Sequence, residues 1–324
     1  MNLRRLSTAF LYTAAICLAS PVMAAQTFPS KPIKFVIPYP PGGTSDTLGR
    51  LVADGMAKQL GQPVIVENRP GAATVIGTDN VAKSQPDGYT VLLTSPGVAI
   101  NASMRTNLTY DTNRDIQHIA TLAELPMAIF AQAKGSLDSV NDILAAARQN
   151  PAAVTYGTAG TGSTGHLTIK LMEHLTKTEL LHVPFQGSAP SVNAAAGNHV
   201  QLAVDTVYLG KPMIDAGKLK AIVTFGEQRS SLLPDTPTAL ESGLPKLIST
   251  AWYAIAVRRG TPAEITQRLN TAITTTLSQP NVNEALQRMG FQVIGDTPDQ
   301  AENRFQGEMK KMADAVRLSG VTVP

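Results

Sequence analysis

Two glycine-rich loops carry the residues of this sequence that are best placed to do chemistry. Residues 33–46 read IKFVIPYPPGGTSD, and residues 154–166 read VTYGTAGTGSTGH. Each segment passes from a short apolar run through glycines to the hydroxyl-bearing start of a helix. The first N–H groups of a helix lack carbonyl partners and carry partial positive charge, so both loops are typical of anion sites. Beyond the apolar runs, the loop parts at 38–46 and 157–166 contain no Lys or Arg, which favours a cleft that grips a small carboxylated molecule from two sides and then releases it.

Phosphate and dinucleotide sites fit these loops poorly. Gly157 and Gly162 have the spacing of a P-loop, but Ser163 stands where a phosphate-gripping Lys belongs. Neither loop matches the G-x-G-x-x-G fingerprint of dinucleotide sites. Tight turns without a ligand would explain one such loop equally well, whereas two loops in corresponding positions favour a ligand site.

A serine hydrolase is the main alternative to a binding protein. Ser163 and His166 lie three residues apart at a helix start, and Asp205 could complete a triad. However, Ser163 has no G-x-S-x-G pattern around it, and helix neighbours at this spacing often touch without catalysing a reaction. We therefore expect a protein that is not an enzyme. We also expect no metal or cofactor, because the remaining histidines lack ligand spacing such as H-E-x-x-H: His118, His174, His182 and His199.

The first 24 residues predict a secretory signal. Arg4 and Arg5 precede an apolar run at 9–19, and 22–24 (VMA) form a cleavage site with small residues at the two positions that a signal peptidase reads. The apolar run is too short and too interrupted for a membrane anchor, which needs about 20 apolar residues. We predict cleavage after Ala24, a mature chain in the periplasm, and no thiol in it, because Cys17 is the only cysteine.

The charge balance of the mature chain is close to neutral. The whole sequence has 27 basic and 24 acidic residues, and the signal contains two of the basic residues and no acid. The resulting net charge of about +1 argues against nucleic acid or an anionic membrane as a partner. A mature chain of about 300 residues is long enough for two domains with their own cores, and we expect it to be a monomer.

The elements that must position the loops alternate between strands and helices, a pattern typical of parallel sheets covered on both faces. In the first block of alternating elements, residues 33–94, Thr44 or Ser45 is expected to cap a helix that ends at Gly61. The predicted strands and helices of the two blocks are, in chain order, strands at 33–37, 64–66 and 91–94 with a helix at 75–82, then helix 140–147, strand 154–156, helix 164–175, strand 180–183, helix 190–196, strand 201–204, a short helix near Met213 and strand 219–224.

A Pro- and Gly-rich passage at 234–245 marks the boundary between the second block and the C-terminal segment. Beyond it one strand (252–257) and three helices (262–277, 283–289 and 298–318) cannot form a sheet domain of their own, so we expect them to return to the first block. The prediction is an α/β fold of two lobes with crossing connections and a cleft between them, in which each lobe is a mostly parallel sheet flanked by helices. Lobe 1 comprises 25–124 plus 249–324, and lobe 2 comprises 125–248.

Short motifs along nearly the whole mature chain resemble the Bug family, the periplasmic solute-binding proteins of tripartite tricarboxylate transporters. The motifs occur in the family's order: PPGGTSD at 40–46, VENRPGA at 66–72, PDGYT at 86–90, GTGS at 160–163 with HL at 166–167, HVPFQGS at 182–188, AGKL at 216–219, PDTPT at 234–238 and the stretch from Trp252 to Pro262. Two departures are Thr158, where the family often has Ser, and the Pro40-Pro41 pair, where Ala-Pro is common.

The resemblance implies that the two α/β lobes form a two-lobed, periplasmic-binding-protein-like clamshell, which holds a ligand carboxylate mainly through backbone amides and waters of two βα loops. It also implies integral membrane transporter subunits as partners and no cofactor. Carried onto this chain, it predicts the following ligand-binding residues: Tyr39, Gly42, Gly43, Thr44, Ser45 and Asp46 on one lobe, Thr158, Ala159, Gly160, Gly162, Ser163 and His166 on the other, and Gln186, Gly187, Ser188 and Asp205 at the rim.

The chemistry of these residues narrows the ligand. No basic residue lies in either loop, so a mono- or dicarboxylate is favoured over a tricarboxylate, because each further buried carboxylate without a partner is costly. Asp205, at the end of a predicted strand, could accept a hydrogen bond from a ligand amine or hydroxyl. We expect an extracytoplasmic protein that captures a small organic carboxylate and delivers it to a membrane transporter. A sensor subunit that passes its ligand-bound form to a signalling receptor would use the same site.

Overall fold

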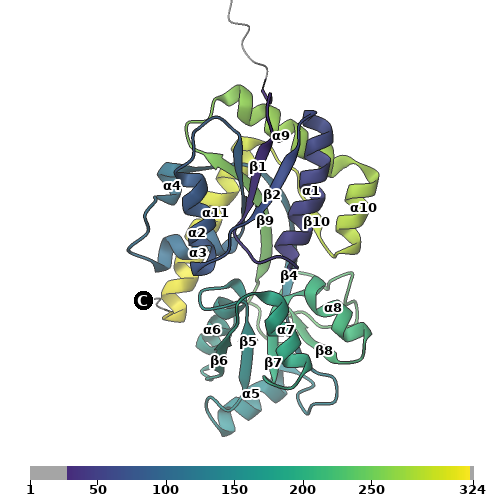
Figure 1. Cartoon of the computed structure of the whole chain (residues 1–324). Helices are drawn as coiled ribbons and strands as arrows, with labels where there is room; N and C mark the ends of the chain where they lie inside the picture. Colours follow the sequence, from purple (N-terminus) through teal and green to yellow (C-terminus); the bar gives the residue numbers. More distant parts are fainter. Residues whose placement is uncertain (1–27, 322–324) are drawn as a thin grey trace, which may run out of the picture.

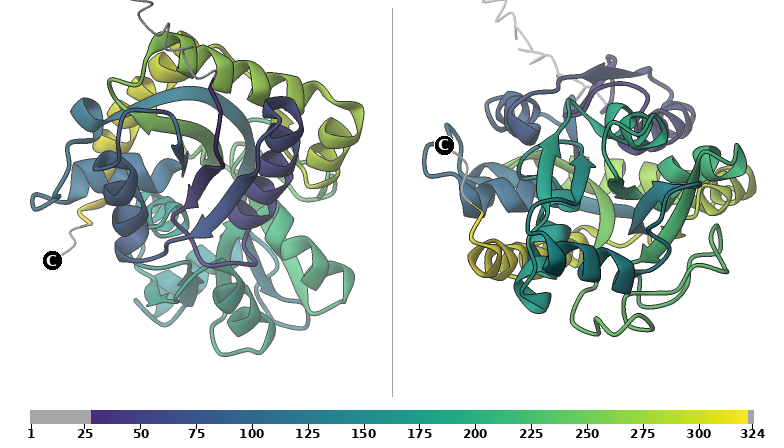
Figure 2. Two further views of the ribbon diagram at one scale, coloured as in Figure 1. Left: turned by 45° about the horizontal axis from the view of Figure 1, so that its top comes forward. Right: turned by 90° about the horizontal axis from the view of Figure 1, so that it is seen from below.

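The computed structural model describes residues 28–321, which form two α/β lobes joined by long strands (Figure 1). The predicted signal segment and its cleavage site lie outside these residues. The α/β clamshell prediction is confirmed: each lobe has a central sheet with helices on both faces (Figures 1 and 2). Among the described residues, no helix has the length and apolar character needed to cross a membrane.

The sheet of lobe 1 begins with three parallel strands in the order β2, β1, β3. They are β1 (Ile33–Ile37), β2 (Val64–Asn68) and β3 (Thr90–Thr94). Next to β3 lies β9 (Thr250–Arg258), which runs antiparallel to it. The chain segment after the predicted boundary therefore supplies a strand inside the first sheet. The short strand β10 (Gln292–Val293) pairs with β4 (Ile116–Gln132).

The sheet of lobe 2 repeats the parallel arrangement with three strands in the order β6, β5, β7. They are β5 (Thr155–Thr158), β6 (Leu181–Pro184) and β7 (Leu202–Thr206). The second half of β4 runs antiparallel to β7 and is also antiparallel to β8 (Leu219–Thr224) on its other side. The parallel strands of both lobes end at the side on which the two lobes face each other, which is where open α/β sheets bind ligands.

Both sheets are mixed rather than mostly parallel, because β4 and β9 add antiparallel pairs. The 17-residue β4 pairs with β9 as far as Pro126 and with β7 from Met127 onward, so one strand serves both sheets. Thirteen of its 17 residues are buried and the other four are half-buried, and a strand buried on both faces lacks the polar–apolar alternation that would reveal it in a sequence. This strand was not predicted.

The helices cover the two sheets as amphipathic layers. In lobe 1 they are α1 (Thr44–Leu60), the 3-10 turn η1 (Ala72–Thr74), α2 (Val75–Ala82), α3 (Pro96–Met104), α4 (Thr112–Asp115), α9 (Ala263–Ser278), α10 (Pro280–Arg288) and α11 (Pro298–Ser319). In lobe 2 they are α5 (Val140–Gln149), α6 (Thr164–Thr176), α7 (Ser188–Ala196) and α8 (Val207–Asp215). The yellow and light green C-terminal helices lie beside the N-terminal elements in all views (Figures 1 and 2).

Helix α1 illustrates how local sequence sets its element. Leu48, Val52 and Met56 recur at helical spacing and are fully buried. Gly61 ends the helix in a left-handed conformation, φ 67°, and its N–H donates to the Ala57 carbonyl. The predicted cap is wrong: the N-cap is Gly43, which has no side chain to cap the helix, and Thr44 and Ser45 lie within the first turn.

Helix α11 contacts both lobes. Its Phe305 ring stacks on His118 of β4, with ring centroids 3.6 Å apart, and its Glu308 accepts a hydrogen bond from Trp252 Nε1 at 3.0 Å. Near its C-terminal end, Ala315 packs in one cluster with Ile100 of α3 and Leu167 of α6. This helix therefore lies across the back of the junction between the lobes.

Candidate ligand-binding cleft

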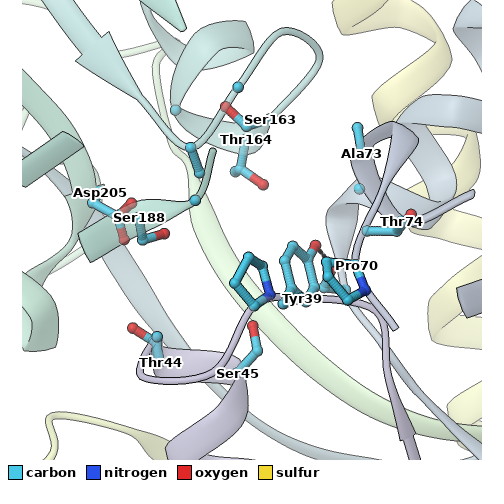
Figure 3. Close-up of a pocket in the computed structure, with 18 of the residues that line it drawn as sticks. Tyr39, Thr44, Ser45, Pro70, Ala73, Thr74, Ser163, Thr164, Ser188 and Asp205 are labelled. Carbon is cyan, nitrogen blue, oxygen red and sulfur yellow. Dashed lines mark hydrogen bonds between the residues drawn. The ribbon is translucent and has the colours of Figure 1, made fainter. Parts of the chain in front are cut away.

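The cleft lies between the lobes and has a volume of about 260 Å³. Residues of both lobes face one another across it (Figure 3). Twelve of the sixteen predicted site residues line this cleft: Tyr39, Gly43, Thr44, Ser45, Ala159, Gly160, Gly162, Ser163, Gln186, Gly187, Ser188 and Asp205.

The N-terminal ends of helices converge on the cleft from both lobes. The N-cap residues of α1, α3, α6, α7 and α8 all line it: Gly43, Ser95, Ser163, Gly187 and Thr206. Only Ser163 uses its side chain as a cap, accepting the His166 backbone N–H. The other four starts have no side-chain cap, so first-turn N–H groups and the positive ends of helix dipoles face the cleft.

The charges of the residues that line the cleft also indicate an anion site. Within the described chain, no Lys, Arg or His lines the cleft, and Asp205 is its only carboxyl side chain. An anion bound there would be stabilised by oriented N–H and O–H donors instead of by a formal positive charge.

Asp205 is buried at the end of β7. Its Oδ1 accepts the Thr206 backbone N–H at 2.8 Å, and its carboxyl group also forms a hydrogen bond with Ser188. Burial raises the pKa of Asp205 above its usual value, although these hydrogen bonds act in the opposite direction. The carboxyl oxygens can accept a hydrogen bond from a ligand hydroxyl, ammonium or protonated carboxyl group, and the neutral form, which burial favours, can also donate one.

Two tyrosines form part of the cleft lining. Burial raises the pKa of Tyr39 to about 12, and its hydroxyl forms a hydrogen bond with Ser95. Burial also raises the pKa of Tyr253, which forms a hydrogen bond with Ser45. Both phenols therefore stay protonated at neutral pH and add no negative charge to the cleft.

A direct contact joins the lobes at the cleft. Thr44 Oγ1 of α1 and Thr206 Oγ1 at the end of β7 lie 2.8 Å apart, and both residues are buried. At another point a Cβ on Gly187 would lie 3.3 Å from Pro40 Cγ, so the two lobes approach closely here. Gly187 has φ +114°, a conformation that favours glycine.

Gly42 and Asp46, two of the predicted site residues, are not among the residues that line the cleft. The Gly42 N–H donates to Asp46 Oδ2 at 3.0 Å, and Asn68 Nδ2 donates to Asp46 Oδ1 at 2.9 Å. Arg50 forms an ion pair with the same carboxylate at 3.0 Å. Burial opposes ionisation of Asp46, but these three partners lower its pKa below the usual value. This carboxylate is thus already fully engaged in holding the first loop.

Thr158 and His166 also lie behind their loop instead of lining the cleft. His166 Nδ1 accepts the Gly162 N–H at 3.1 Å, which takes that N–H away from a ligand. The hydrogen bond between His166 and Ser163 runs from a backbone N–H to Ser163 Oγ at 3.3 Å. The imidazole acceptor is therefore occupied by Gly162 and is not placed to activate the serine, as a triad requires.

Several lining residues were not predicted. The segment 70–74 contributes a strained turn in which Ala72, Ala73 and Thr74 all have positive φ, at 45°, 53° and 90°. Asn101 holds this turn by donating to the Ala73 carbonyl and to Thr74 Oγ1. Nothing in an Ala-Ala-Thr sequence indicates such a conformation, which costs energy and is concentrated at functional sites. The other unpredicted contributors include Pro96, Gly97, Met127, Thr164, Thr206 and Tyr253.

A sequence profile described as "Tripartite tricarboxylate transporter family receptor" matches residues 48–320. The chain belongs to this family. Protein BugT of Bordetella pertussis is 32% identical over 323 residues, covering 99% of each chain. An Agrobacterium vitis protein encoded in the TAR-I ttuE-ttuC' intergenic region is 35% identical over 315 residues, covering 96% of this chain and 91% of its own. The resemblance to Bug proteins is thereby confirmed.

Solved structures of the family share the fold described above. An R. palustris protein with adipate superimposes with a TM-score of 0.87 at 30% identity, covering 91% of this chain and 99% of its own. MatC from Rhodopseudomonas palustris, with bound malate, has a TM-score of 0.84 at 30% identity, covering 89% and 100%. The periplasmic binding protein BugD has a TM-score of 0.85 at 28% identity, covering 91% and 99%. The family consists of periplasmic solute-binding proteins, which are not enzymes.

Proposed function

We propose that this protein captures a small organic carboxylate in the interlobe cleft and delivers it to the membrane subunits of a tripartite transporter. The single observation that supports this best is the convergence of five helix N-termini on a cleft without a basic side chain. Such a site binds an anion by dipoles and N–H donors, and lobe closure replaces the water around the anion with those donors.

The ligand class is a mono- or dicarboxylate. Without a basic side chain in the lining, a third carboxylate would have to be buried without a counter-charge. Two structural neighbours are named with dicarboxylates, adipate and malate, which supports this class. Asp205 adds a preference for a ligand that presents a hydrogen-bond donor beside its carboxylate, such as a hydroxyl or ammonium group.

The lobes move as the bodies predicted from the sequence, 25–124 plus 249–324 and 125–248. This division is supported by the positions at which strands change sheets: β4 changes partners between Pro126 and Met127, and β9 begins at Thr250. Closure bends the chain at these crossings. The protein works in the periplasm as a monomer, after signal cleavage following Ala24, and only its closed, ligand-filled form docks productively on the transporter.

A thermal-shift screen tests the function directly. The protein beginning at Ala25 is heated with mono-, di- and tricarboxylates that include adipate, malate and citrate, with neutral sugars and amines as controls. A ligand present at about 100 times its Kd should add roughly 2.7 kcal/mol of stability. Titration calorimetry then gives the affinity. If no carboxylate stabilises the protein beyond the neutral controls, the proposed function is wrong.

A further inference from the structure

Three aromatic rings from three elements stack behind the second glycine loop. His166 of α6 lies against His182 of β6 with centroids 3.9 Å apart and planes inclined by 9°. His182 also stacks with Tyr156 of β5, its register partner on the neighbouring strand, with centroids 5.0 Å apart and planes inclined by 30°. None of the three rings lines the cleft. The stack therefore contacts the back of the loop whose front faces the proposed ligand.

Each imidazole holds one end of the loop. At the beginning, His182 Nε2 lies 2.8 Å from Thr158 Oγ1, and that hydroxyl accepts the Gly160 N–H at 3.2 Å. At the end, His166 Nδ1 accepts the Gly162 N–H at 3.1 Å. Gly160 and Gly162 have φ values of +129° and +77°. Because Gly160 and Gly162 can adopt many backbone conformations, the loop would be free to vary, and these hydrogen bonds select one of its conformations.

The protonation state of the two histidines suits the hydrogen bonds that they form with the loop. Burial, with smaller contributions from His182 and Lys170, lowers the pKa of His166 to about 3. Burial, with a smaller contribution from Lys170, lowers the pKa of His182 to about 4. Glu173, the acid of the same helix face, is engaged by Lys170 and by the Leu180 N–H. Both rings are therefore neutral near pH 7. A neutral imidazole that accepts at Nδ1 carries its proton on Nε2, so His166 has a fixed tautomer.

We propose that the stacked His166–His182 pair is a positioning element that sets the anion-binding loop of lobe 2 without touching the ligand. By fixing Gly160 and Gly162, the pair directs the start of α6, where the N–H groups of Thr164 and Gly165 have no helical acceptor, toward the cleft. The importance of this loop for binding rests on the proposed function, whereas the tie between the rings and the loop does not.

Paired substitutions separate the hydrogen bond from the packing. His166→Asn keeps an acceptor near the position of Nδ1, whereas His166→Leu removes it; His182→Gln and His182→Leu form the same contrast at Nε2. His174→Leu, an exposed histidine on the same helix, is the matched control. The measurements are hydrogen exchange of residues 158–165 without ligand, and calorimetric titration with malate and with adipate.

We expect both leucine variants to exchange at least tenfold faster at Gly160 or Gly162 than wild type, and to bind the better of the two dicarboxylates about five- to tenfold more weakly. The Asn and Gln variants should stay within about threefold of wild type in both measurements, and His174→Leu should change neither. A purely structural role would lower the melting temperature of each pair equally, without rescue by Asn or Gln. Folded leucine variants with wild-type exchange at this loop would overturn the proposal.

A measurement on the unmodified protein covers the case in which a leucine variant does not fold. The ring ¹⁵N resonances of His166 at pH 7 should show a neutral imidazole with its proton on Nε2. A proton on Nδ1, or a charged ring, would overturn the proposal, because Nδ1 could then not accept from Gly162. If neither malate nor adipate nor any other carboxylate binds wild type, the proposed function fails, while the exchange and ¹⁵N results still decide the role of the histidine pair.

Discussion

The hydrogen bond between Thr44 and Thr206 offers a direct test of the interlobe contact. The two hydroxyl oxygens lie 2.8 Å apart, and the residues are 3% exposed, so neither hydroxyl can exchange its partner freely for water. Thr44 belongs to α1 of lobe 1, and Thr206 ends β7 of lobe 2. Removing either hydroxyl by a Thr→Val substitution keeps the shape of the side chain and removes this bond.

The expected magnitude follows from the chemistry of the pair. A neutral hydrogen bond contributes about 0.5–1.5 kcal/mol net, and a buried hydroxyl left without a partner costs about 1–3 kcal/mol. Thr206 Oγ1 keeps a weak second contact, 3.4 Å from Asp205 Oδ1, so the loss should lie toward the lower end. Each single variant should lose about 1 kcal/mol, and the double variant should lose less than the sum, with a coupling of about 0.5–1.5 kcal/mol.

Urea unfolding of wild type, both single variants and the double variant measures this coupling, first without ligand and then with saturating adipate or malate. Thr274→Val is the control, because Thr274 carries a comparable helix hydroxyl, bonded to the Asn270 carbonyl at 3.0 Å, far along the chain in α9. It should show no coupling to either variant. Coupling below about 0.3 kcal/mol in both conditions would refute the contact, and coupling seen only with ligand would assign it to the closed state.

Three further predictions concern the cleft and the fold. Gly43→Val should fold normally, since Gly43 has φ −91° and a Cβ there meets nothing within 4 Å, yet calorimetry should show strongly weakened carboxylate binding; wild-type affinity would mean that this loop is only a turn. Ser163→Ala should weaken carboxylate binding by about 0.5–1.5 kcal/mol and leave any trace ester hydrolysis unchanged, and a loss of real turnover in that assay would favour a hydrolase. Hydrogen bonds from His118 and Arg259 lower the pKa of Glu302 from 4.5 to about 2, although burial opposes this shift. The ionised Glu302 should therefore contribute fully to stability above pH 4.5, and this contribution should be lost as the pH falls toward 2. The stability of Glu302→Gln, measured by unfolding at a series of acidic pH values, should lack this pH dependence, and a pH dependence equal to that of wild type would contradict the prediction.

Local sequence signals determined most of the strands, helices and turns that surround the cleft. Turn residues, left-handed glycines and apolar periodicity act over a few neighbouring positions, so the strands at 33–37 and 219–224 and the helix at 75–82 have the predicted bounds. The same local signals located the two glycine loops at helix starts, because a strand, a glycine turn and a hydroxyl-rich helix start lie within one short segment. The absence of basic residues from both loops was likewise readable without a structure.

Tertiary structure alone decided which groups of those loops face the cleft. The sequence predicted Gly162 as a ligand-binding residue, but His166 accepts its N–H because the loop folds back onto α6. The sequence predicted Asp46 as a ligand-binding residue, but its carboxylate is bound by Asn68, from the next strand, and by Arg50, and it does not line the cleft. Such competition between partners depends on side-chain positions in space, which a motif does not encode.

The same limit applies to the parts that join the lobes. The burial of β4 on both faces removes the alternation that would have revealed a 17-residue strand serving both sheets. The strained turn at 72–74 exists because Asn101 of α3 holds it. Tyr253 reaches the cleft from a strand more than two hundred residues after Tyr39. Periodicity reports burial within one element, whereas these features arise from packing between elements that are distant in the sequence, so only the folded chain specifies them.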